Sequence, residues 1–244
     1  MNIPTREQLL NNGINVAIAI PLERNIRDIA FLSIIPILQK GYGYIGGNYG
    51  RTDMARNQIA KDFMDSDFTH VLMMDSDHIH PPDLVERLAR WVINDPEKKI
   101  VSGINFRRSA PYDPCVYMEM ENGQLAAPLR WDNGIGLADV VGFGCVLISR
   151  EVFPQLERPY FAYGYAEEGS QSEDIYFSLQ CKQKGIKIWV DTTTTSPHIT
   201  DRMITEKDFR YYVDTHPEMV AVESDKANPP SNSIAIPSMG INIG

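Results

Sequence analysis

The segment HVLMMDSD, residues 70–77, decides the fold because it joins a short apolar run to two carboxylates. An apolar run of this length, without regular polar alternation, is typical of a strand that is buried on both faces of a sheet. Comparable runs occur at VAIAI (16–20), IVSG (100–103) and IKIWV (186–190). Segments with helical spacing lie between them, and this alternation predicts one α/β domain with a mostly parallel central sheet and helices on both faces.

The helices are predicted by apolar residues that recur at intervals of three and four. One such segment covers residues 26–37, where Pro36 marks a kink or an end. A second helix reaches to about Phe63, with Thr52 or Asp53 as its N-cap. These helices supply the layers that would cover the sheet.

The second half of the chain is less regular. The segment VVGFGCVLI, residues 140–148, predicts a strand whose two glycines indicate a bend or a close backbone approach. Ser172 is typical of a helix N-cap, and Gly185 ends that helix. We expect residues 1–222 to form the domain. Residues 223–244 are rich in Pro, Ser, Asn and Gly, which predicts a tail that is extended or ordered by a partner; its isoleucines leave a homo-oligomer open.

Charge and composition exclude several classes of protein. Among 244 residues, Asp and Glu number 32 against 23 Lys and Arg, and the formal net charge is −9. Such a surface repels a phosphate backbone, so a general nucleic-acid binder is not expected. Cys115, Cys145 and Cys181 are too widely spaced for a disulfide framework or a zinc cluster, and we expect buried thiols in a reducing compartment. The polar N-terminus and the lack of a long apolar stretch predict a cytoplasmic protein without a membrane span.

Polar residues follow the predicted strands at the edge where an open α/β sheet binds its ligands. Because the carboxyl ends of parallel strands meet there, we expect these residues to converge. They are Asp75, Ser76 and Asp77 after the strand at 70–74, Asn105, Arg107 and Arg108 after the strand at 100–103, and Asp191 and His198 after the strand at 186–190.

Asp75 and Asp77 form the most specific motif. Two carboxylates at the end of an apolar strand are costly unless a positive charge lies beside them. A divalent cation bound to a phosphate supplies this charge, and oxygen ligands suit Mg²⁺ or Mn²⁺. The alternative is a solvated acidic turn, which the three letters alone make equally plausible. His78 and His80 precede two prolines, and we expect both on the surface.

Glu173 and Asp174 stand in the first turn of the helix capped by Ser172. Acidic residues there complement the helix dipole, which is sufficient to explain them. The functional alternative is a general base that faces the crevice. Arg56 and Asn57 lie near the N-terminus of another helix, a position suited to a diphosphate, although Arg56 is equally consistent with a solvated helix face.

The order of these segments resembles that of GT-A type glycosyltransferases, in particular the family-2-like set. The resemblance covers residues 16 to 200 and implies a Rossmann-like domain. It is carried by VAIAIP (16–21), ARNQIA (55–60), HVLMMDSD (70–77), DVVGFGCVLISREVF (139–153), SEDIYFSLQCKQKG (172–185), and IKIWVD (186–191) followed by His198.

The resemblance also implies a role for each matching residue. Asp75, Asp77 and His198 resemble the metal site, with Asp75 nearer the ribose or a metal-bound water. Asp174, beside Glu173, matches the catalytic base of inverting members. The donor nucleotide and sugar would contact Pro21, Glu23, Arg56, Asn57, Asp75, Ser76, Gly142 and Gly144.

The implied activity is the metal-dependent transfer of a sugar from a nucleotide-diphosphate sugar to an acceptor hydroxyl. The glycine-rich segment 41–50 contains no acidic residue to read the base, so UDP- and GDP-sugars both remain open. One alternative is a nucleotidyltransferase that acts on a sugar phosphate. The sequence PLERN (21–25) stands where such enzymes carry a glycine-rich basic loop, which argues against it. Another alternative is a non-catalytic nucleotide-sugar-binding protein of the same fold.

Overall fold

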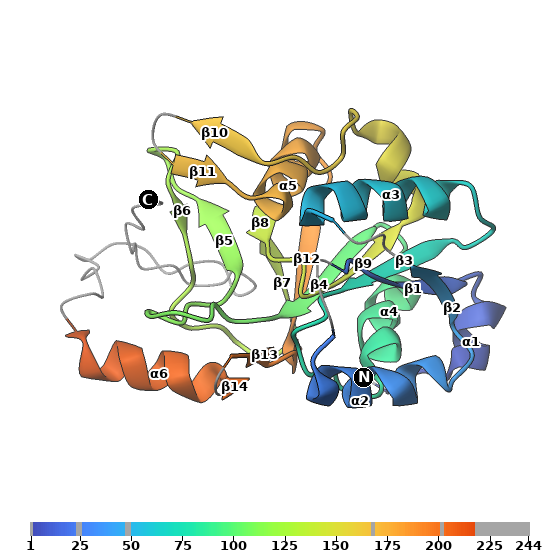
Figure 1. The fold of residues 1–244 in the computed structure, drawn as a ribbon, viewed down its shortest axis with the longest axis horizontal. Coiled ribbons are helices and arrows are strands. Elements are labelled where there is room, and N and C mark those ends of the chain that lie inside the picture. Colours follow the sequence, from blue (N-terminus) through green and yellow to red (C-terminus); the bar gives the residue numbers. More distant parts are fainter. Residues whose placement is uncertain (1, 23–25, 47–49, 167–168, 201–202, 218–244) are drawn as a thin grey trace.

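The computed structural model of the chain describes residues 2–22, 26–46, 50–166, 169–200 and 203–217. Its largest sheet has seven strands in the order β2-β1-β3-β9-β4-β12-β7 (Figure 1). In this order the strands are β2 (Gly43–Gly46), β1 (Val16–Ile20), β3 (His70–Met74), β9 (Cys145–Ser149), β4 (Ile100–Ile104), β12 (Ile188–Thr195) and β7 (Ile135–Ala138).

The pairing of the strands confirms a mostly parallel sheet. Strand β1 is parallel to β2 and β3, and β12 is parallel to β4. Strand β9 lies between β3 and β4 and is antiparallel to both, so β3 and β4 run in the same direction. Only β9 and the edge strand β7 run against the others in this sheet. The carboxyl ends of β1, β3, β4 and β12 therefore meet at one edge.

Helices cover both faces of the sheet, as predicted (Figure 1). On one face, Ile18 of β1 belongs to the same apolar cluster as Ile34 of α2 (Asp28–Leu38) and Leu88 of α4 (Leu84–Asn94). On the other face, Ala19 of β1 shares a cluster with Ile59 of α3. The five helices around the sheet are α1 (Arg6–Asn11), α2 (Asp28–Leu38), α3 (Thr52–Met64), α4 (Leu84–Asn94) and α5 (Glu173–Gln183).

The predicted element boundaries hold best where a strand is apolar throughout. All residues of β1 and β3 are buried, and both strands have the predicted bounds. Helix α3 begins at Thr52 with Arg51 as its N-cap, so the N-cap prediction at Thr52 or Asp53 is wrong by one or two residues. Helix α2 continues past Pro36 to Leu38.

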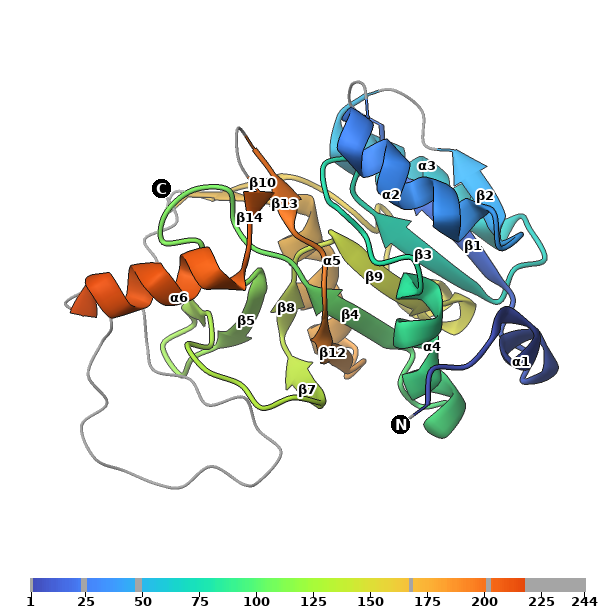
Figure 2. The same cartoon turned by 90° about the horizontal axis from the view of Figure 1, so that it is seen from below.

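Several of the remaining elements, including β5 (Val116–Glu119), β8 (Val140–Val141) and α6 (Glu206–Thr215), lie to one side of the sheet (Figure 2), whereas η1 (Arg150–Gln155) contacts α3 and β9. The segment 140–148 is indeed interrupted at its glycines, because β8 ends at Val141 and β9 begins at Cys145. The other elements are β6 (Leu125–Ala126), β10 (Gly164–Ala166), β11 (Gly169–Gln171), β13 (His198–Ile199) and β14 (Met203–Ile204).

Two further expectations concern the thiols and the membrane. Cys145 and Cys181 are buried free thiols, whereas Cys115 is partly exposed. Among the residues that the structure describes, no helix combines the length and apolar character needed to cross a bilayer. The predicted tail at 223–244 lies outside the described residues.

Candidate functional site

Backbone pairing brings the acidic motif and His198 together. The segment that follows β3 lies against the segment that follows β12, and the two form an isolated antiparallel bridge between His78 and His198. The amide of Ile79 donates to the carbonyl of Pro197 at 2.9 Å, and the amide of Ile199 donates to the carbonyl of Asp77 at 2.8 Å. These hydrogen bonds fix residues that are far apart in the sequence, independently of any ligand.

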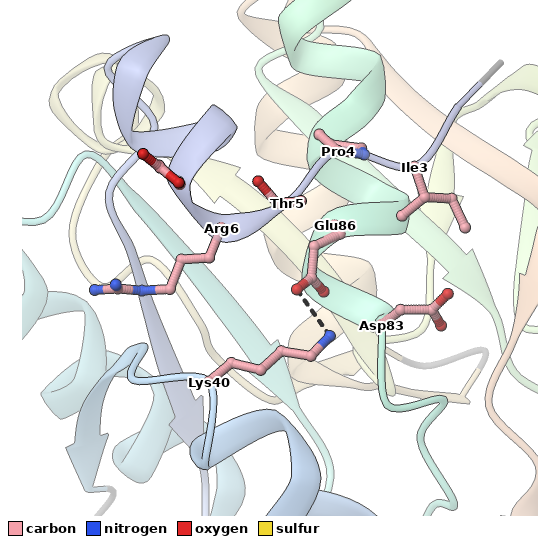
Figure 3. Close-up of a pocket in the computed structure, with 8 residues that line it drawn as sticks. Ile3, Pro4, Thr5, Arg6, Lys40, Asp83 and Glu86 are labelled. Atoms are coloured by element: carbon pink, nitrogen blue, oxygen red, sulfur yellow. Dashed lines mark hydrogen bonds and ion pairs between the residues drawn. The ribbon is translucent and has the colours of Figure 1, made fainter.

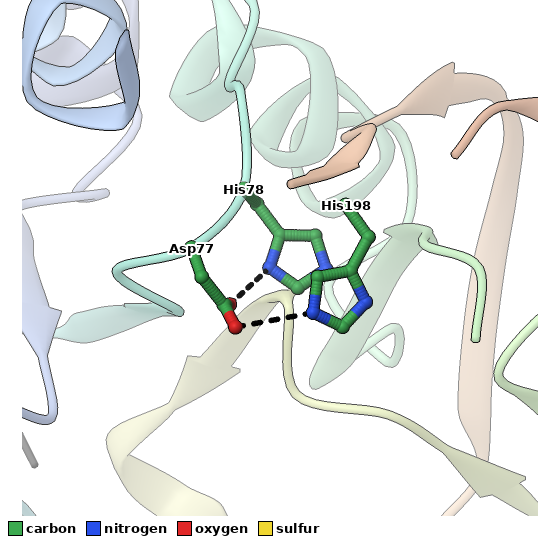
Figure 4. Close-up of side chains that lie close together, drawn as sticks. All are labelled: Asp77, His78 and His198. Atoms are coloured by element: carbon green, nitrogen blue, oxygen red, sulfur yellow. Dashed lines mark hydrogen bonds and ion pairs between the residues drawn. The ribbon is translucent and has the colours of Figure 1, made fainter. Parts of the chain in front are cut away.

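The side chains of Asp77, His78 and His198 form one cluster (Figure 4). The carboxylate of Asp77 lies beside both rings, with Oδ1 at 3.0 Å from Nδ1 of His78 and Oδ2 at 3.1 Å from Nε2 of His198. The two rings stack, with centroids 4.1 Å apart. One candidate ligand atom from each residue lies within 4.8 Å of the others. A carboxylate and two imidazoles at this spacing are suitable ligands for a divalent cation.

The electrostatics of the cluster keep Asp77 ionised. Burial by itself disfavours the charged carboxylate, but hydrogen bonds with His198 and His78 outweigh it and hold the pKa of Asp77 well below its usual range. The Nδ1 atom of His198 lies 2.9 Å from the carbonyl oxygen of Phe106. When Nδ1 donates to this carbonyl, Nε2 is the nitrogen left to bind a cation, a common arrangement around metal ligands.

The expectation that His78 and His80 lie on the surface is wrong. Their exposed fractions are 1% and 2%, because the segment around Ser196 covers the turn that holds them. His80 contacts the Ser196 hydroxyl and the Asp75 carbonyl oxygen at 3.1 Å each, and burial lowers its pKa to about 3. His78 is therefore a candidate ligand that was not predicted from the sequence, although its position directly after Asp77 was an available signal.

Asp75 has a different partner from Asp77. Its Oδ1 atom accepts a hydrogen bond from Nη2 of Arg56 at 2.7 Å, and the other end of the same guanidinium contacts Oε1 of Glu173. Arg56 is 2% exposed and lies 5.0 Å from the ring of Phe143. Burial opposes its charge, but Asp75 and Glu173 raise its pKa. The two carboxylates of the motif thus separate, one to an arginine and one to the histidines.

Removing the charge of Arg56 is expected to destabilise the protein strongly. Arg56→Met would leave Asp75 and Glu173 without their shared cation, a loss of about 3–5 kcal/mol for a buried pair. The matched control is Arg87→Met, because Arg87 pairs with Asp83 at a partly exposed site and should contribute about 1 kcal/mol or less. Urea denaturation measures both; equal losses in the two variants would contradict this assignment.

The acidic pair at the start of α5 also divides between two environments. Glu173 is 6% exposed, and burial raises its pKa although Arg56 acts in the opposite direction. Asp174 is partly exposed, and its Oδ1 atom accepts hydrogen bonds from the amide of Ile175 at 2.8 Å and from the hydroxyl of Ser172. Both hydrogen bonds are made to Oδ1, so one oxygen of the carboxylate is fixed within the protein. The side chain of Asp174 remains partly exposed.

Asn57 and the two glycines serve contacts within the protein. Asn57 donates to the carbonyl of Phe161 at 2.6 Å and accepts from the amide of Tyr160 at 2.9 Å, which ties α3 to the loop after η1. A Cβ atom on Gly142 would lie 2.7 Å from that of Cys115, and one on Gly144 would lie 2.8 Å from Cγ of Asn105. Glycine is therefore required here by close packing.

The other residues predicted near the site follow β1, stand within the acidic motif or follow β4. Pro21 is buried directly after β1, and Ser76 is partly exposed between the two aspartates. Glu23 lies outside the described residues. Arg108, in the loop after β4, brings Nη1 to 3.3 Å from Oδ2 of Asp77, so part of the expected convergence is confirmed.

Asp191 does not take part in this convergence. Strand β12 continues to Thr195, so Asp191 lies inside the strand rather than after its end. Its carboxylate is fully buried, pairs with Arg90 of α4 at 2.9 Å and accepts hydrogen bonds from Thr193 and Thr194. The expectation that Asp191 faces the site is therefore wrong, and its role is to link α4 to the sheet.

A pocket elsewhere on the surface is distinct from this site. It lies between the N-terminal end of α1 and α4, where Lys40 and Glu86 form an ion pair at 2.8 Å (Figure 3). None of the predicted site residues that the structure describes lines it. Its lining residues are Ile3, Pro4, Thr5, Arg6, Glu7, Lys40, Asp83 and Glu86.

Comparison with known proteins gives similarity in structure but not in sequence. No protein-family model matches the chain, and no curated protein matches its sequence significantly. The protein A197 from STIV matches with a TM-score of 0.56 and 17% identity, over 77% of this chain and 86% of that one. Glucosyl-3-phosphoglycerate synthase from Mycobacterium tuberculosis, in complex with Mn²⁺, UDP-glucose and phosphoglyceric acid, matches with a TM-score of 0.51 and 14% identity, over 91% and 88%.

A third solved structure is GalNAc-T7 with UDP, GalNAc and Mn²⁺. It matches with a TM-score of 0.51 and 10% identity, over 82% of this chain and 48% of that one. Identities this low establish the arrangement of the backbone and not the chemistry. The chain has a GT-A-like fold.

Proposed function

We propose that the chain is a metal-dependent glycosyltransferase that moves a sugar from a nucleotide-diphosphate sugar to an acceptor hydroxyl, with inversion at the anomeric carbon. The contact between Asp77 Oδ2 and His198 Nε2, at 3.1 Å, carries the proposal. It joins residues after β3 and β12 at the carboxyl edge of the sheet, where open α/β folds bind their ligands.

In this proposal Asp77 and His198 hold a divalent cation. When bound, the cation supplies positive charge that stabilises the nucleoside diphosphate as it leaves the sugar. The ionised state of Asp77 and the orientation of His198 by the Phe106 carbonyl both favour this role. Mn²⁺ in the solved complexes of glucosyl-3-phosphoglycerate synthase and GalNAc-T7 supports a divalent cation in this fold.

Asp174 is the proposed general base. Its carboxylate would accept the proton of the acceptor hydroxyl as that oxygen attacks the anomeric carbon. Hydrogen bonds from Ile175 and Ser172 hold the carboxylate in place. Glu173 and Arg56 then position the helix end and Asp75, rather than contacting the reacting atoms. The sequence-based role of Arg56 as a phosphate ligand is less favoured, because both ends of its guanidinium already contact carboxylates.

The donor can be found by thermal shift. Stabilisation by a ligand grows with its concentration relative to its dissociation constant, so millimolar UDP, GDP or CDP should raise Tm even when binding is weak. We expect one nucleoside diphosphate to raise Tm by several degrees with Mn²⁺, by about 1–3 kcal/mol of stabilisation, and little without it. The absence of any metal-dependent shift would favour a non-catalytic protein of this fold.

The reaction product then distinguishes glycosyl transfer from nucleotidyl transfer. A glycosyltransferase releases a nucleoside diphosphate from the matching nucleotide sugar when an acceptor is present. A nucleotidyltransferase releases pyrophosphate from a nucleoside triphosphate and a sugar phosphate. Pyrophosphate release would contradict the proposal directly.

A further inference from the structure

We propose that His78 is a third protein ligand of the cation, beside Asp77 and His198, and that this site binds a first-row transition metal before any nucleotide arrives. The inference rests on the proposed function, because it concerns the same cation. His78 lies outside the acidic motif of Asp75 and Asp77, and the cation is expected to bind before the nucleotide.

His78 is buried without a full set of partners. Its exposed fraction is 1%; Nδ1 faces Asp77 at 3.0 Å, and Nε2 has no hydrogen-bond partner in the part of the chain that the structure describes. His80, two residues on, is equally buried. A buried imidazole with an unpaired nitrogen lowers stability. Protein oxygens contact both ring nitrogens of His80. In His78, Nδ1 faces the Asp77 carboxylate, so Nδ1 is the nitrogen that can share a cation with Asp77 (Figure 4).

The three candidate ligands are already gathered. The bridge between His78 and His198 and the hydrogen bond from Ile199 to the Asp77 carbonyl fix both segments of backbone. The Phe106 carbonyl orients the ring of His198. Ligand atoms that are held close together in advance bind a cation without a large ordering cost. A site with this organisation should therefore bind metal without the help of a diphosphate.

The donor set predicts which metal binds. Mg²⁺ prefers oxygen ligands and loses water reluctantly, so a site with two imidazoles disfavours it. For a mixed nitrogen and oxygen site, affinity rises from Mn²⁺ to Co²⁺. Three protein ligands also leave coordination positions open for the oxygens of a diphosphate. We therefore expect affinity to increase from Mg²⁺ to Mn²⁺ to Co²⁺.

Calorimetric titration of the full chain with each metal, without nucleotide, tests the inference. We expect one Mn²⁺ site per chain, tighter binding of Co²⁺, and Mg²⁺ binding at least about 100-fold weaker than Mn²⁺. His78→Gln should weaken Mn²⁺ binding by about 10- to 100-fold, as should His198→Gln. The matched control is His70→Gln, because His70 is a mostly buried histidine at the opposite end of β3. This variant should bind Mn²⁺ as the unmodified chain does.

Each alternative result overturns a defined part of the inference. Equal Mn²⁺ affinity of the His78→Gln variant and the unmodified chain would remove His78 as a ligand; circular dichroism verifies that the variant is folded. Mn²⁺ binding to the unmodified chain only after a nucleoside diphosphate is added would contradict the preassembled site, and this measurement needs no variant. Metal binding without any nucleotide binding would instead contradict the proposed function and leave this inference intact.

Discussion

Asp77→Asn is expected to abolish metal-dependent binding of the donor and to lower kcat/KM by about 1000-fold or more. The amide keeps the shape of the side chain but removes the negative charge that contacts Nδ1 of His78 and Nε2 of His198. An uncharged oxygen is a much weaker ligand for a divalent cation. Release of nucleoside diphosphate measures the change in kcat/KM, and calorimetric titration with the donor and Mn²⁺ measures the loss of donor binding.

The control for this variant is Asp65→Asn. Asp65 is an exposed carboxylate at the end of α3 that pairs with Lys61, so its loss tests the general effect of removing one charge. It should leave both donor binding and turnover unchanged. Full activity of the Asp77→Asn variant would remove the cation from the proposed mechanism.

Asp174→Asn should separate catalysis from donor binding. The amide retains an oxygen that can accept the hydrogen bonds from Ile175 and Ser172, but it cannot take a proton from the acceptor. Loss of a general base typically lowers kcat by about 100- to 10,000-fold. The affinity for the donor and Mn²⁺ should stay within about threefold, because Asp174 does not belong to the cluster of Asp77, His78 and His198. Single-turnover transfer and calorimetry measure the two quantities.

Glu157→Gln provides the comparison for Asp174→Asn. Glu157 is an exposed carboxylate that pairs with Lys184 at the C-terminal end of α5. Its neutralisation should change neither kcat nor the affinity for the donor. If Asp174→Asn loses donor affinity as strongly as turnover, Asp174 binds the donor and another group takes the proton.

Continuous apolar runs in the sequence predicted the strand boundaries most accurately. Strands β1 and β3 have the predicted bounds because a strand buried on both faces must be apolar throughout, and this leaves a local signal. Strand β12 ran longer than predicted. Its C-terminal half contains threonines whose hydroxyls bond to Asp191, so burial there depends on hydrogen bonds and not on apolar side chains. A polar segment of this kind resembles a loop in the sequence.

The candidate site was predictable to the extent that it follows from strand ends. Asp77 and His198 meet because parallel strands end at the same edge, and this rule needs no knowledge of side-chain contacts. The partners of Arg56 could not be predicted, because Glu173 is 117 residues away and no local pattern links them. The burial of His78 was missed for the same reason: the segment that covers it comes from beyond β12.

In the proposed mechanism a divalent cation, held by Asp77 and His198, joins the protein to the diphosphate of its donor. The most direct measurement is an anomalous difference map from crystals that contain Mn²⁺ and the nucleoside diphosphate with the largest thermal shift. We expect one strong peak in coordination contact with the Asp77 carboxylate, with Nε2 of His198 and with diphosphate oxygens. A diphosphate bound with no peak at Asp77 and His198 would contradict it.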